Sequence, residues 1–477
     1  MQRKFSVVVV AGLLLAITQS TFAAPKPPAN SSAPSTVASV GGILPLTCAG
    51  NTARCLYGYV YYGGTPVSGA SVRIDSLFGT TTITTTSGGL SASPYFQSSL
   101  SDAPLLASAG DTITLTASYN GSSATTVYVV APGGQQGDVV IPISPLSGNG
   151  SDGDLTVTGL VDVNPVRAIV SGTAGSNVLT ISGVTGSGFQ PNQMVLIHQS
   201  RGTNAGVWEQ RTIQLVGTTQ LTLTAPLSNT YTTDSGASRA QALWVPQYRN
   251  LTINAGGTIE PAGWHGNVGG ISAFLASGTV TINGTISLLG RGYRGPIFGT
   301  SPGSEGTQGE GEVGDGSYNS QSANGGGGGG GQSYSSPNGA SGGGGGSHAT
   351  AGTSGGAGAG SGRTPGAAGN LSNDLPDLTR ALFGGAGGTG GNQGGLTDTP
   401  DSGKGGGFIF ISASTVVVTG SGNISADGGP ANGGPHDQSG GQAGGAGGSV
   451  LLKSQTINLG TNLVTALVHP GLNGPNV

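Results

Sequence analysis

The sequence predicts an all-β protein, with an N-terminal β-sandwich followed by a β-solenoid-like region that carries a long glycine-rich insertion. Short runs rich in Val, Ile, Thr and Tyr alternate with Gly, Pro, Asn and Ser along most of the chain, the pattern of strands and turns. One short two-strand unit recurs on both sides of a glycine-rich segment. Glycine supplies 95 of the 477 residues and charged residues only 8%, which excludes coiled coils and helical bundles.

The charge distribution excludes nucleic acid as a partner. The formal net charge is −4, and lysine and arginine form no cluster along the chain. Binding to a phosphate backbone needs several basic side chains together. Common disordered chains combine low hydrophobicity with high net charge, whereas 35% of the residues here are hydrophobic. We therefore expect a folded chain with a lean core.

Residues 1–23 predict a secretory signal peptide. Arg3 and Lys4 precede an apolar run over 5–17, and residues 21–23 fit a cleavage site with small residues. A membrane anchor is the alternative, but the run is shorter than the ~20 apolar residues that span a bilayer. We expect cleavage, no membrane span in the remaining chain, and a secreted product in the medium, at the cell surface or in the periplasm. A linker rich in Pro and Ser follows over 24–47.

The two cysteines, Cys48 and Cys55, are predicted to form a disulfide. An exported chain meets an oxidising compartment, in which a close pair of cysteines normally becomes oxidised. The ring is small, so the bond would hold a local loop and add little to the stability of the fold. A redox or metal pair is the alternative, but the spacing is not CxxC and no histidine or third cysteine lies nearby.

The segment 48–146 has the strand pattern of a small β-sandwich. Within it, residues 58–74 (GYVYYGGTPVSGASVRI) follow the pattern GxVxxxGxPVxGAxV. This stretch resembles the opening of carboxypeptidase regulatory-like domains, which are transthyretin-like sandwiches. The resemblance implies an accessory or spacer module without peptidase chemistry.

A polar hinge is predicted over 147–154, before the next strands. It contains Asp152 and Asp154. A calcium loop would need more oxygen ligands at regular spacing and an acidic residue further along. We therefore expect both aspartates in a solvated turn.

Strand patterns continue over 155–250, which we expect to form a small β domain. Its densest group of chemically versatile side chains is His198, Arg201, Trp208, Glu209 and Arg211. These residues suit the lining of a ligand groove. The alternative, which we favour, places them on the polar faces of two strands, with Trp208 covering the intervening loop.

The repeated unit predicts a solenoid. Copies begin at 270, 407 and 448, with a half copy at 251–260, and each joins an apolar strand to a Thr-bearing strand between glycines. A unit this short cannot bury its own apolar face, whereas stacked units bury a continuous core. We therefore expect 251–299 and 406–470 to form one solenoid, with strands after Gly406 pairing with those of 251–290.

The intervening segment 300–405 is the glycine-rich insertion, and two interpretations of it stay open. It is either a flexible Gly/Ser linker or a bundle of extended, polyproline-II-like strands whose glycines let backbones pack closely. Collagen is excluded because glycine does not occur at every third position. The flanking solenoid copies favour partial order, as does the apolar stretch within 373–382, the one helix candidate. In composition the segment resembles glycine-rich domains of certain receptor kinases and phage tail adhesins.

Taken as a whole, the chain from 148 onward resembles a group of secreted bacterial glycine-rich β-solenoid proteins. The residues that carry the resemblance are 150–159, 195–213, 245–266 and 278–295. It implies an exported, β-rich surface protein and no activity.

No grouping of residues predicts catalysis, a cofactor or a metal site. The histidines are scattered, without the i, i+4 pairing of zinc proteases. The rival enzyme hypothesis is a polysaccharide lyase or hydrolase, which needs grouped carboxylates beside basic residues. Its candidates are Asp398, Asp401 and Lys404, joined by Asp427 and Lys453. The alternative, which we favour, places the first three in a solvated loop that ends the glycine-rich segment.

The favoured function is therefore an exported structural or adhesive surface protein without catalytic activity. The leader, the repeat and the glycine-rich segment motivate it. Low charge with abundant Thr, Ser, Asn and Gly suits contact with surface glycans, with other surface proteins or with a second copy of the chain.

Overall fold

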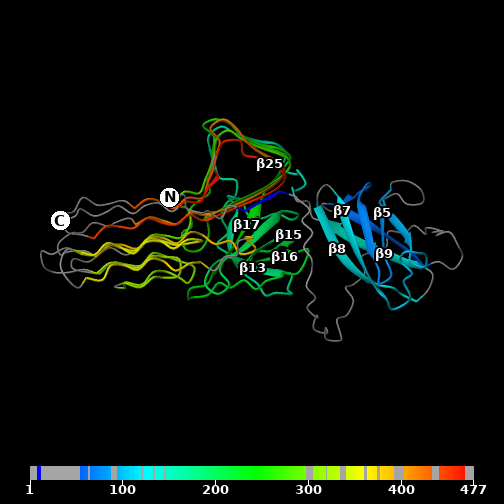
Figure 1. Ribbon diagram of the computed structural model, residues 1–477, viewed down its shortest axis with the longest axis horizontal. Coiled ribbons are helices and arrows are strands. Elements are labelled where there is room, and N and C mark those ends of the chain that lie inside the picture. Colours follow the sequence, from blue (N-terminus) through cyan, green and yellow to red (C-terminus); the bar gives the residue numbers. More distant parts are fainter. Residues whose placement is uncertain are drawn as a thin grey trace. The chain divides into compact units, whose positions relative to one another are not determined.

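The computed structural model describes residues 8–11, 54–62, 65–86, 94–119, 122–132, 135–143, 147–296, 305–318, 320–332, 340–358, 363–372, 377–391, 402–431, 440–462 and 464–467. It divides into two compact units, one formed by 12–148 and the other by 149–477 together with 1–11. The described residues contain strands and no helix (Figure 1). The predicted all-β class is confirmed.

The unit 12–148 is a sandwich of two four-stranded sheets. In one sheet β2 (Cys55–Tyr62) pairs with β3 (Thr65–Pro66), β6 (Phe96–Ser99) and, in parallel, β9 (Gln135–Ile143). The other has the order β5 (Thr80–Thr84), β4 (Ser71–Asp75), β7 (Thr112–Tyr119) and β8 (Ser122–Val129). Alternate residues of β4 and β7 are buried, because successive side chains of a strand point to opposite faces. One apolar cluster fills the space between the sheets.

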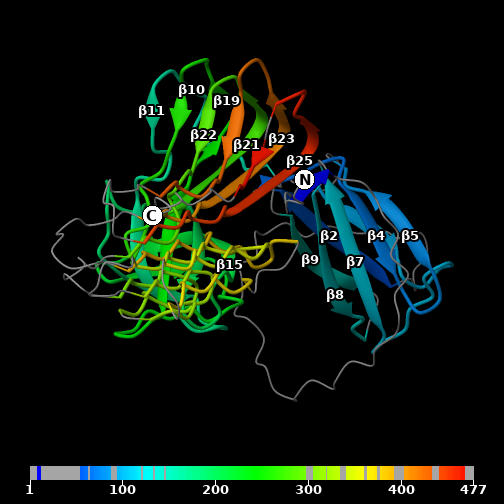
Figure 2. The same ribbon diagram turned by 60° about the vertical axis from the view of Figure 1, so that its left-hand side comes forward.

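The second unit is built on a solenoid of parallel strands (Figure 2). Its longer sheet has the order β1 (Val8–Ala11), β25 (Ser449–Asn458), β23 (Phe408–Val418), β21 (Ile271–Ile282), β19 (Leu251–Ile253) and β10 (Leu155–Val157), and β18 (Gln247–Tyr248) also pairs with β21. The second sheet has the order β11 (Leu160–Val161), β20 (Thr258–Ile259), β22 (Thr285–Ser287), β24 (Asn423–Ser425) and β26 (Val464–Thr465). We call each pair of consecutive strands from the two sheets a rung, from the first (β10 and β11) to the fifth (β25 and β26).

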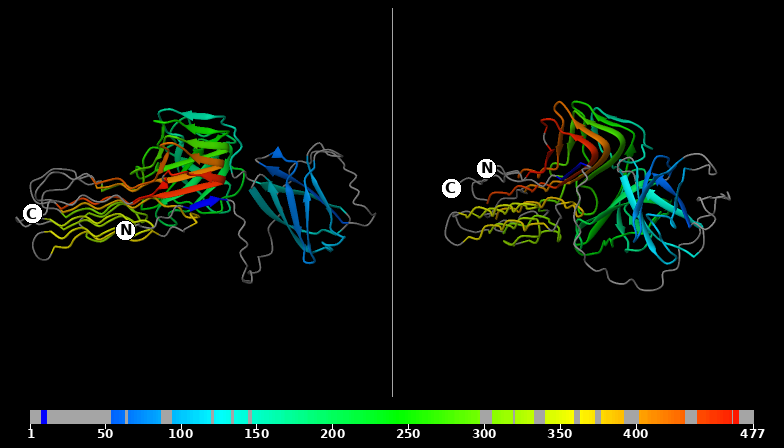
Figure 3. Two further views of the ribbon diagram at one scale, coloured as in Figure 1. Left: turned by 45° about the horizontal axis from the view of Figure 1, so that its top comes forward. Right: turned by 45° about the vertical axis from the view of Figure 1, so that its right-hand side comes forward.

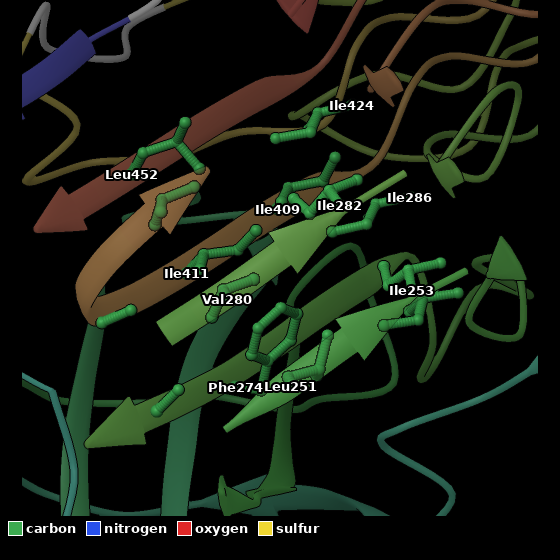
Figure 4. Close-up of a cluster of buried hydrophobic side chains, with 14 of the residues drawn as sticks. Leu251, Ile253, Phe274, Val280, Ile282, Ile286, Ile409, Ile411, Ile424 and Leu452 are labelled. Atoms are coloured by element: carbon green, nitrogen blue, oxygen red, sulfur yellow. The ribbon is translucent and has the colours of Figure 1, made fainter. Parts of the chain in front are cut away.

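Apolar side chains stack from rung to rung and form the solenoid core. β21 pairs with β23 from Ile271↔Phe408 to Ile282↔Val418, which is the pairing across the insertion that the repeats predict. Figure 4 shows the labelled side chains of successive strands gathered in the interior of the solenoid. These side chains belong to one cluster that includes Ile282, Ile286 and Ile424, each with no exposed surface. At ~1.5–3 kcal/mol for each buried side chain, this core can hold rungs that lie far apart in the sequence.

The solenoid begins earlier than the strand pattern predicts. We expected 155–250 to form a separate small β domain, but β10 and β11 pair with β19 and β20 and make the first rung. Both hinge aspartates are exposed at a turn, as predicted, and each accepts hydrogen bonds. Asp152 Oδ2 accepts a bond of 2.6 Å from the backbone of Gln247, and Asp154 accepts hydrogen bonds from Arg249 and Asn250. Short strands at an edge carry too little periodicity to be assigned from sequence to one domain or another.

A closed barrel is inserted between the first and second rungs. Its order is β12 (Arg167–Ser171), β13 (Val178–Ser182), β16 (Gln220–Leu223), β15 (Trp208–Val216), β14 (Met194–Arg201) and β17 (Arg239–Val245), which pairs back with β12. It has its own apolar cluster, which includes Val195, Ile213 and Leu221. The central strand β14 is buried over almost its whole length, so both of its faces are covered.

The described parts of the glycine-rich insertion are ordered, as extended segments that lie side by side (Figure 1). Backbone hydrogen bonds connect four of them, and a fifth segment that begins at 440, in series: Gly329 N–H donates to Ala367, Gly344 to Gly329, Gly388 to Gly344, and Ala443 to Gly388. A Cβ atom on Gly328 or Gly344 would overlap the carbonyl of a neighbouring segment. Among the described residues, then, the bundle interpretation holds over the linker interpretation, and we call these segments the glycine bundle.

The predicted helix over 373–382 is not formed in its described part. Residues 377–379 make a turn, in which Asp377 Oδ1 accepts hydrogen bonds from the backbone and the hydroxyl of Thr379. Leu378 has a φ of 54°, and Arg380 bridges to Val207. Side-chain to backbone bonds of this kind compete with helical ones.

The apolar run of the predicted leader forms a strand in this unit. β1 pairs in parallel with β25, from Val8↔Leu451 to Ala11↔Ser454, and Figure 3 shows it beside the last long strand of the solenoid. Among the residues that the structure describes, no helix is long and apolar enough to cross a membrane.

Candidate functional site

Three parts of the second unit meet at one apolar cluster, which we call the junction. The barrel contributes residues that include Leu196 and Leu243, the solenoid contributes Phe408 and Phe410, and the glycine bundle contributes Leu378, Ala381, Phe383 and Ala386. Leu378 and Ala381 come from the stretch 373–382 for which the sequence predicts a helix, and Phe383 and Ala386 follow it directly. This cluster fixes where the glycine bundle begins relative to the barrel and the solenoid.

His198 lies at the centre of the junction with no exposed surface. Its ring stacks on Phe383, with 5.6 Å between centroids. Nε2 lies 2.8 Å from the carbonyl oxygen of Ala381, which can only accept, so Nε2 carries the proton. Nδ1 then accepts from the hydroxyl of Ser200 at 2.9 Å. Burial lowers the pKa of His198 to about 4, although the bond to Ala381 favours the charged form. The imidazole is therefore neutral at physiological pH and serves as a fixed hydrogen-bonding link between barrel and bundle.

Arg201, three residues further along β14, is buried in a charge network. Its guanidinium pairs with Glu310 and, at 2.6 Å, with Asp315. Glu310 is itself buried and accepts from Arg294 at 2.9 Å and from the indole of Trp264 at 3.1 Å. The network thus connects β14, the loops after β20 and β22, and the first described segment of the glycine bundle. Removing one member of such a buried set leaves an uncompensated charge.

Trp208 closes the side of the junction next to β25. Its indole donates to the carbonyl of Leu378 at 2.9 Å. Its ring packs on Phe410, with 5.2 Å between centroids, and the Lys453 ammonium lies 5.6 Å from its centroid. Burial lowers the pKa of Lys453, and the aromatic face offers a lysine a favourable cation–π contact. Trp208 therefore packs against the bundle instead of covering a loop.

Glu209 and Arg211 fasten a loop of the barrel. Glu209 accepts from the backbone of Ser228 and of Asn229, both at 3.0 Å, and pairs with Arg211. Arg211 also donates to the carbonyl of Pro226 at 2.9 Å. Their contacts are separate from those of His198, Arg201 and Trp208. The five residues therefore form two structural fastenings. The favoured prediction of polar strand faces is wrong for His198 and Arg201, which are buried, and Trp208 does not cover the loop.

The carboxylates and lysines of the enzyme hypothesis are only partly described. Asp398 and Asp401 lie outside the described residues. The other three belong to two settings: the backbone carbonyl of Asp427 and the side chain of Lys404 both approach Gly290, whereas Lys453 lies at the junction. Asp427 already accepts from the hydroxyls of Ser425 and Thr465, at 2.7 and 2.9 Å. The described members therefore do not converge on one groove.

The described residues bear on two further predictions, which concern metal sites and a disulfide. Within the described parts of the chain, no three His, Cys, Asp or Glu side chains are placed to hold a metal ion. Cys55 is buried at the start of β2, where its sulfur lies 3.3 Å from the amide nitrogen of Gln97. Cys48 lies outside the described residues, so the Cys48–Cys55 disulfide stays a prediction.

Sequence reasoning did not single out Glu310, Asp315 or Phe383. They lie in the glycine-rich insertion, whose composition hides individual residues. A usable signal was present, because acidic residues cluster over 305–315, directly before a stretch over 316–362 that has no Asp, Glu, Lys or Arg. An isolated charge in a lean chain indicates a buried partner elsewhere.

Comparison with known proteins adds no identity. No family model matches the chain, and no curated protein matches it. Among solved structures, the tailspike protein gp49 from Pseudomonas phage LKA1 is similar over 28% of this chain and 30% of its own, with 12% identity and a TM-score of 0.15. A likeness at that score carries no argument about function. The resemblances to carboxypeptidase regulatory-like domains and to secreted glycine-rich solenoid proteins stay predictions.

Proposed function

We propose that this chain is an exported structural or adhesive surface protein without catalytic activity. The observation that carries the proposal is the use made of the few charged and aromatic side chains. Arg201, Glu310 and Trp208 hold the glycine bundle to the solenoid and barrel. Because few charged and aromatic side chains are present and these three fix the glycine bundle in place, the bundle is suited to act as a contact surface.

The surface chemistry of the bundle supports the same function. Its described segments carry mostly glycine, serine, alanine and threonine, and its exposed positions over 349–357 are all of these four types. Such a surface offers donors and acceptors with little charge, which suits glycans or other uncharged polar partners. The predicted export places it where those partners occur.

Cell fractionation with imaging, followed by binding of the purified chain to cells and a glycan panel, tests this proposal. We expect surface or extracellular location and saturable binding. A Glu310→Gln variant, which weakens the attachment of the bundle, should lose binding while an Asp154→Asn variant, changed at an exposed pair, should keep it. A cytoplasmic location would contradict the proposal. Turnover of a polysaccharide, without saturable binding to cells or glycans, would also contradict it.

A further inference from the structure

Both ends of the solenoid are open in the described residues. At one end β10 and β11 each pair on one side only, with β19 and β20. At the other end β26 pairs only with β24, and β25 pairs with β23 and with β1. A strand at the edge of a sheet presents unpaired N–H and C=O groups, which are a template for another strand.

The strand that covers β25 belongs to the predicted leader. β1 lies within 1–23, the segment whose sequence predicts removal on export. Its pairing demonstrates that the outer edge of β25 accepts an apolar strand in parallel orientation. β1 lies along Leu451–Ser454 only, so removal of the leader uncovers that part of the edge, whereas β1 does not pair with the end of β25 that contains Ile457.

The two ends carry matching side chains. One apolar column runs through the longer sheet from Leu155 through Leu251, Val280 and Val416 to Ile457. A second runs through the other sheet from Val161 through Ile259, Ile286 and Ile424 to Val464. The inner members of both columns are buried, whereas the four end members are only partly buried. Each column therefore stops at a half-covered apolar residue at both ends.

We propose that exported copies of this chain associate head to tail, with the fifth rung of one copy pairing with the first rung of the next. The inference rests on removal of residues 1–23, which the proposed function also requires. Because every strand of both sheets is parallel, a second copy in the same orientation continues both sheets and both columns at once. Ile457 then meets Leu155, and Val464 meets Val161. Such a contact joins different surfaces, so it does not close on itself as a symmetric dimer does and extends into a filament.

A second copy fits this edge better than an unrelated strand. An unrelated donor could pair with β25 alone, as β1 does. Only a molecule that presents two parallel edge strands at the spacing of one rung can satisfy β25 and β26 together. The first rung of this chain has that form, and Leu160 on β11 is 72% exposed, so the free side of that rung is accessible.

The test uses matched variants of the chain that begins at Ala24. Leu155→Lys and Ile457→Lys change the two ends of the same column. In a single copy each lysine reaches solvent from a half-buried position, whereas between two copies its charge would be buried without a carboxylate. Thermal unfolding of each variant checks that the fold is kept, and sedimentation velocity over a range of concentrations measures association.

We expect the unsubstituted chain from Ala24 to associate with concentration and each variant to associate at least about tenfold more weakly, a factor that corresponds to ~1.4 kcal/mol. An equimolar mixture of the two variants should give 1:1 dimers, because each supplies the end that the other has lost. Monomeric behaviour of the unsubstituted chain, or no dimer in the mixture, would overturn the proposal. Because the recombinant chain needs no export, a failure here is distinct from a failure of the proposed location.

Discussion

The solenoid and the glycine bundle both stack chain segments side by side, but they fill the space between segments in opposite ways. Between rungs, Ile282, Ile286 and Ile424 supply apolar side chains with no exposed surface. In the bundle the corresponding space is filled by backbone, and at Gly328 even a methyl group would overlap the carbonyl of Gly344. The solenoid is stabilised by removal of side chains from water, and the bundle by lateral hydrogen bonds between peptide groups.

This difference changes what each region tolerates. A solenoid core accepts another apolar residue of similar volume at small cost. At inner positions such as Gly328 and Gly344 the bundle accepts no Cβ, and each glycine loses more conformational entropy on ordering than any other residue. A bundle of this kind therefore needs an anchor, which here is the junction of Phe383, His198 and the Arg201–Glu310 network.

Loss of the buried carboxylate should have the largest effect. A Glu310→Gln variant leaves Arg201 and Arg294 with the half-exposed Asp315 as their one remaining carboxylate in the network. We expect a loss of about 3–5 kcal/mol in the free energy of unfolding. Chemical denaturation followed through Trp264 fluorescence measures it, because that indole donates to Glu310. Asp154→Asn, at an exposed pair with Arg249, is the control and should change stability little. Equal losses of stability in the two variants would show that the Arg201–Glu310 network does not anchor the bundle.

The pH dependence of stability tests the buried histidine. The pKa of His198 is about 4 in the folded chain, against 6.5 as the ordinary value. The unfolded state therefore binds a proton first as the pH falls, and the folded state loses stability between pH 6.5 and about 4. The loss approaches about 3 kcal/mol, since one pKa unit corresponds to ~1.4 kcal/mol. Thermal unfolding across this range measures it, and a His198→Gln variant should lose that part of the dependence. An unchanged pH profile in the variant would assign the effect to other groups.

Alanine substitutions at two glycines test whether the bundle needs glycine for close packing of its backbone. Gly328→Ala should destabilise the bundle by about 2–3 kcal/mol, because the overlapping atom is backbone and cannot rotate away. At Gly356 a Cβ meets nothing within 4 Å, so Gly356→Ala should be neutral or slightly stabilising. Hydrogen exchange with fragment-level resolution compares the two variants. The same small effect at both positions would favour a flexible segment.

The smallest effect is expected in the solenoid core. Ile282→Val removes one methylene from a buried column and should cost about 0.5–1.5 kcal/mol. Differential scanning calorimetry measures the change. Thr281→Val, at a neighbouring position that faces away from the core cluster, is the control, and a greater loss there than at Ile282 would contradict the assigned direction of the column.

The parts predicted from sequence are those with a repeated side-chain pattern. The alternation around Val280 and Val416 predicted strands that pair across more than a hundred residues, and the pairing exists. The first rung was missed because Leu160 and Val161 form a strand of two residues, too short to show a period. The helix prediction near Leu378 was wrong because tertiary contacts to Trp208 and Ala205 hold that stretch as a turn.

Only the barrel side of the junction could be predicted from the sequence. His198, Arg201 and Trp208 were recognised as a group, since mixed side chains lie close together in the sequence. Their partners Glu310, Phe383 and Ala381 lie more than a hundred residues away in a glycine-rich segment, and no local pattern relates them. Order in the bundle depends on bonds between peptide groups, which every residue carries, so composition alone favoured neither interpretation.

Hydrogen exchange of the glycine amides tests the central claim most directly, namely that the bundle is an ordered body held by its own backbone. The amides of Gly328, Gly329, Gly344 and Gly388 donate bonds of 2.9, 2.7, 2.8 and 2.9 Å to neighbouring segments. We predict that they exchange orders of magnitude more slowly than an unstructured chain and that Glu310→Gln accelerates them. Exchange at the unstructured rate in the unsubstituted chain, with the solenoid amides still protected, would contradict the account.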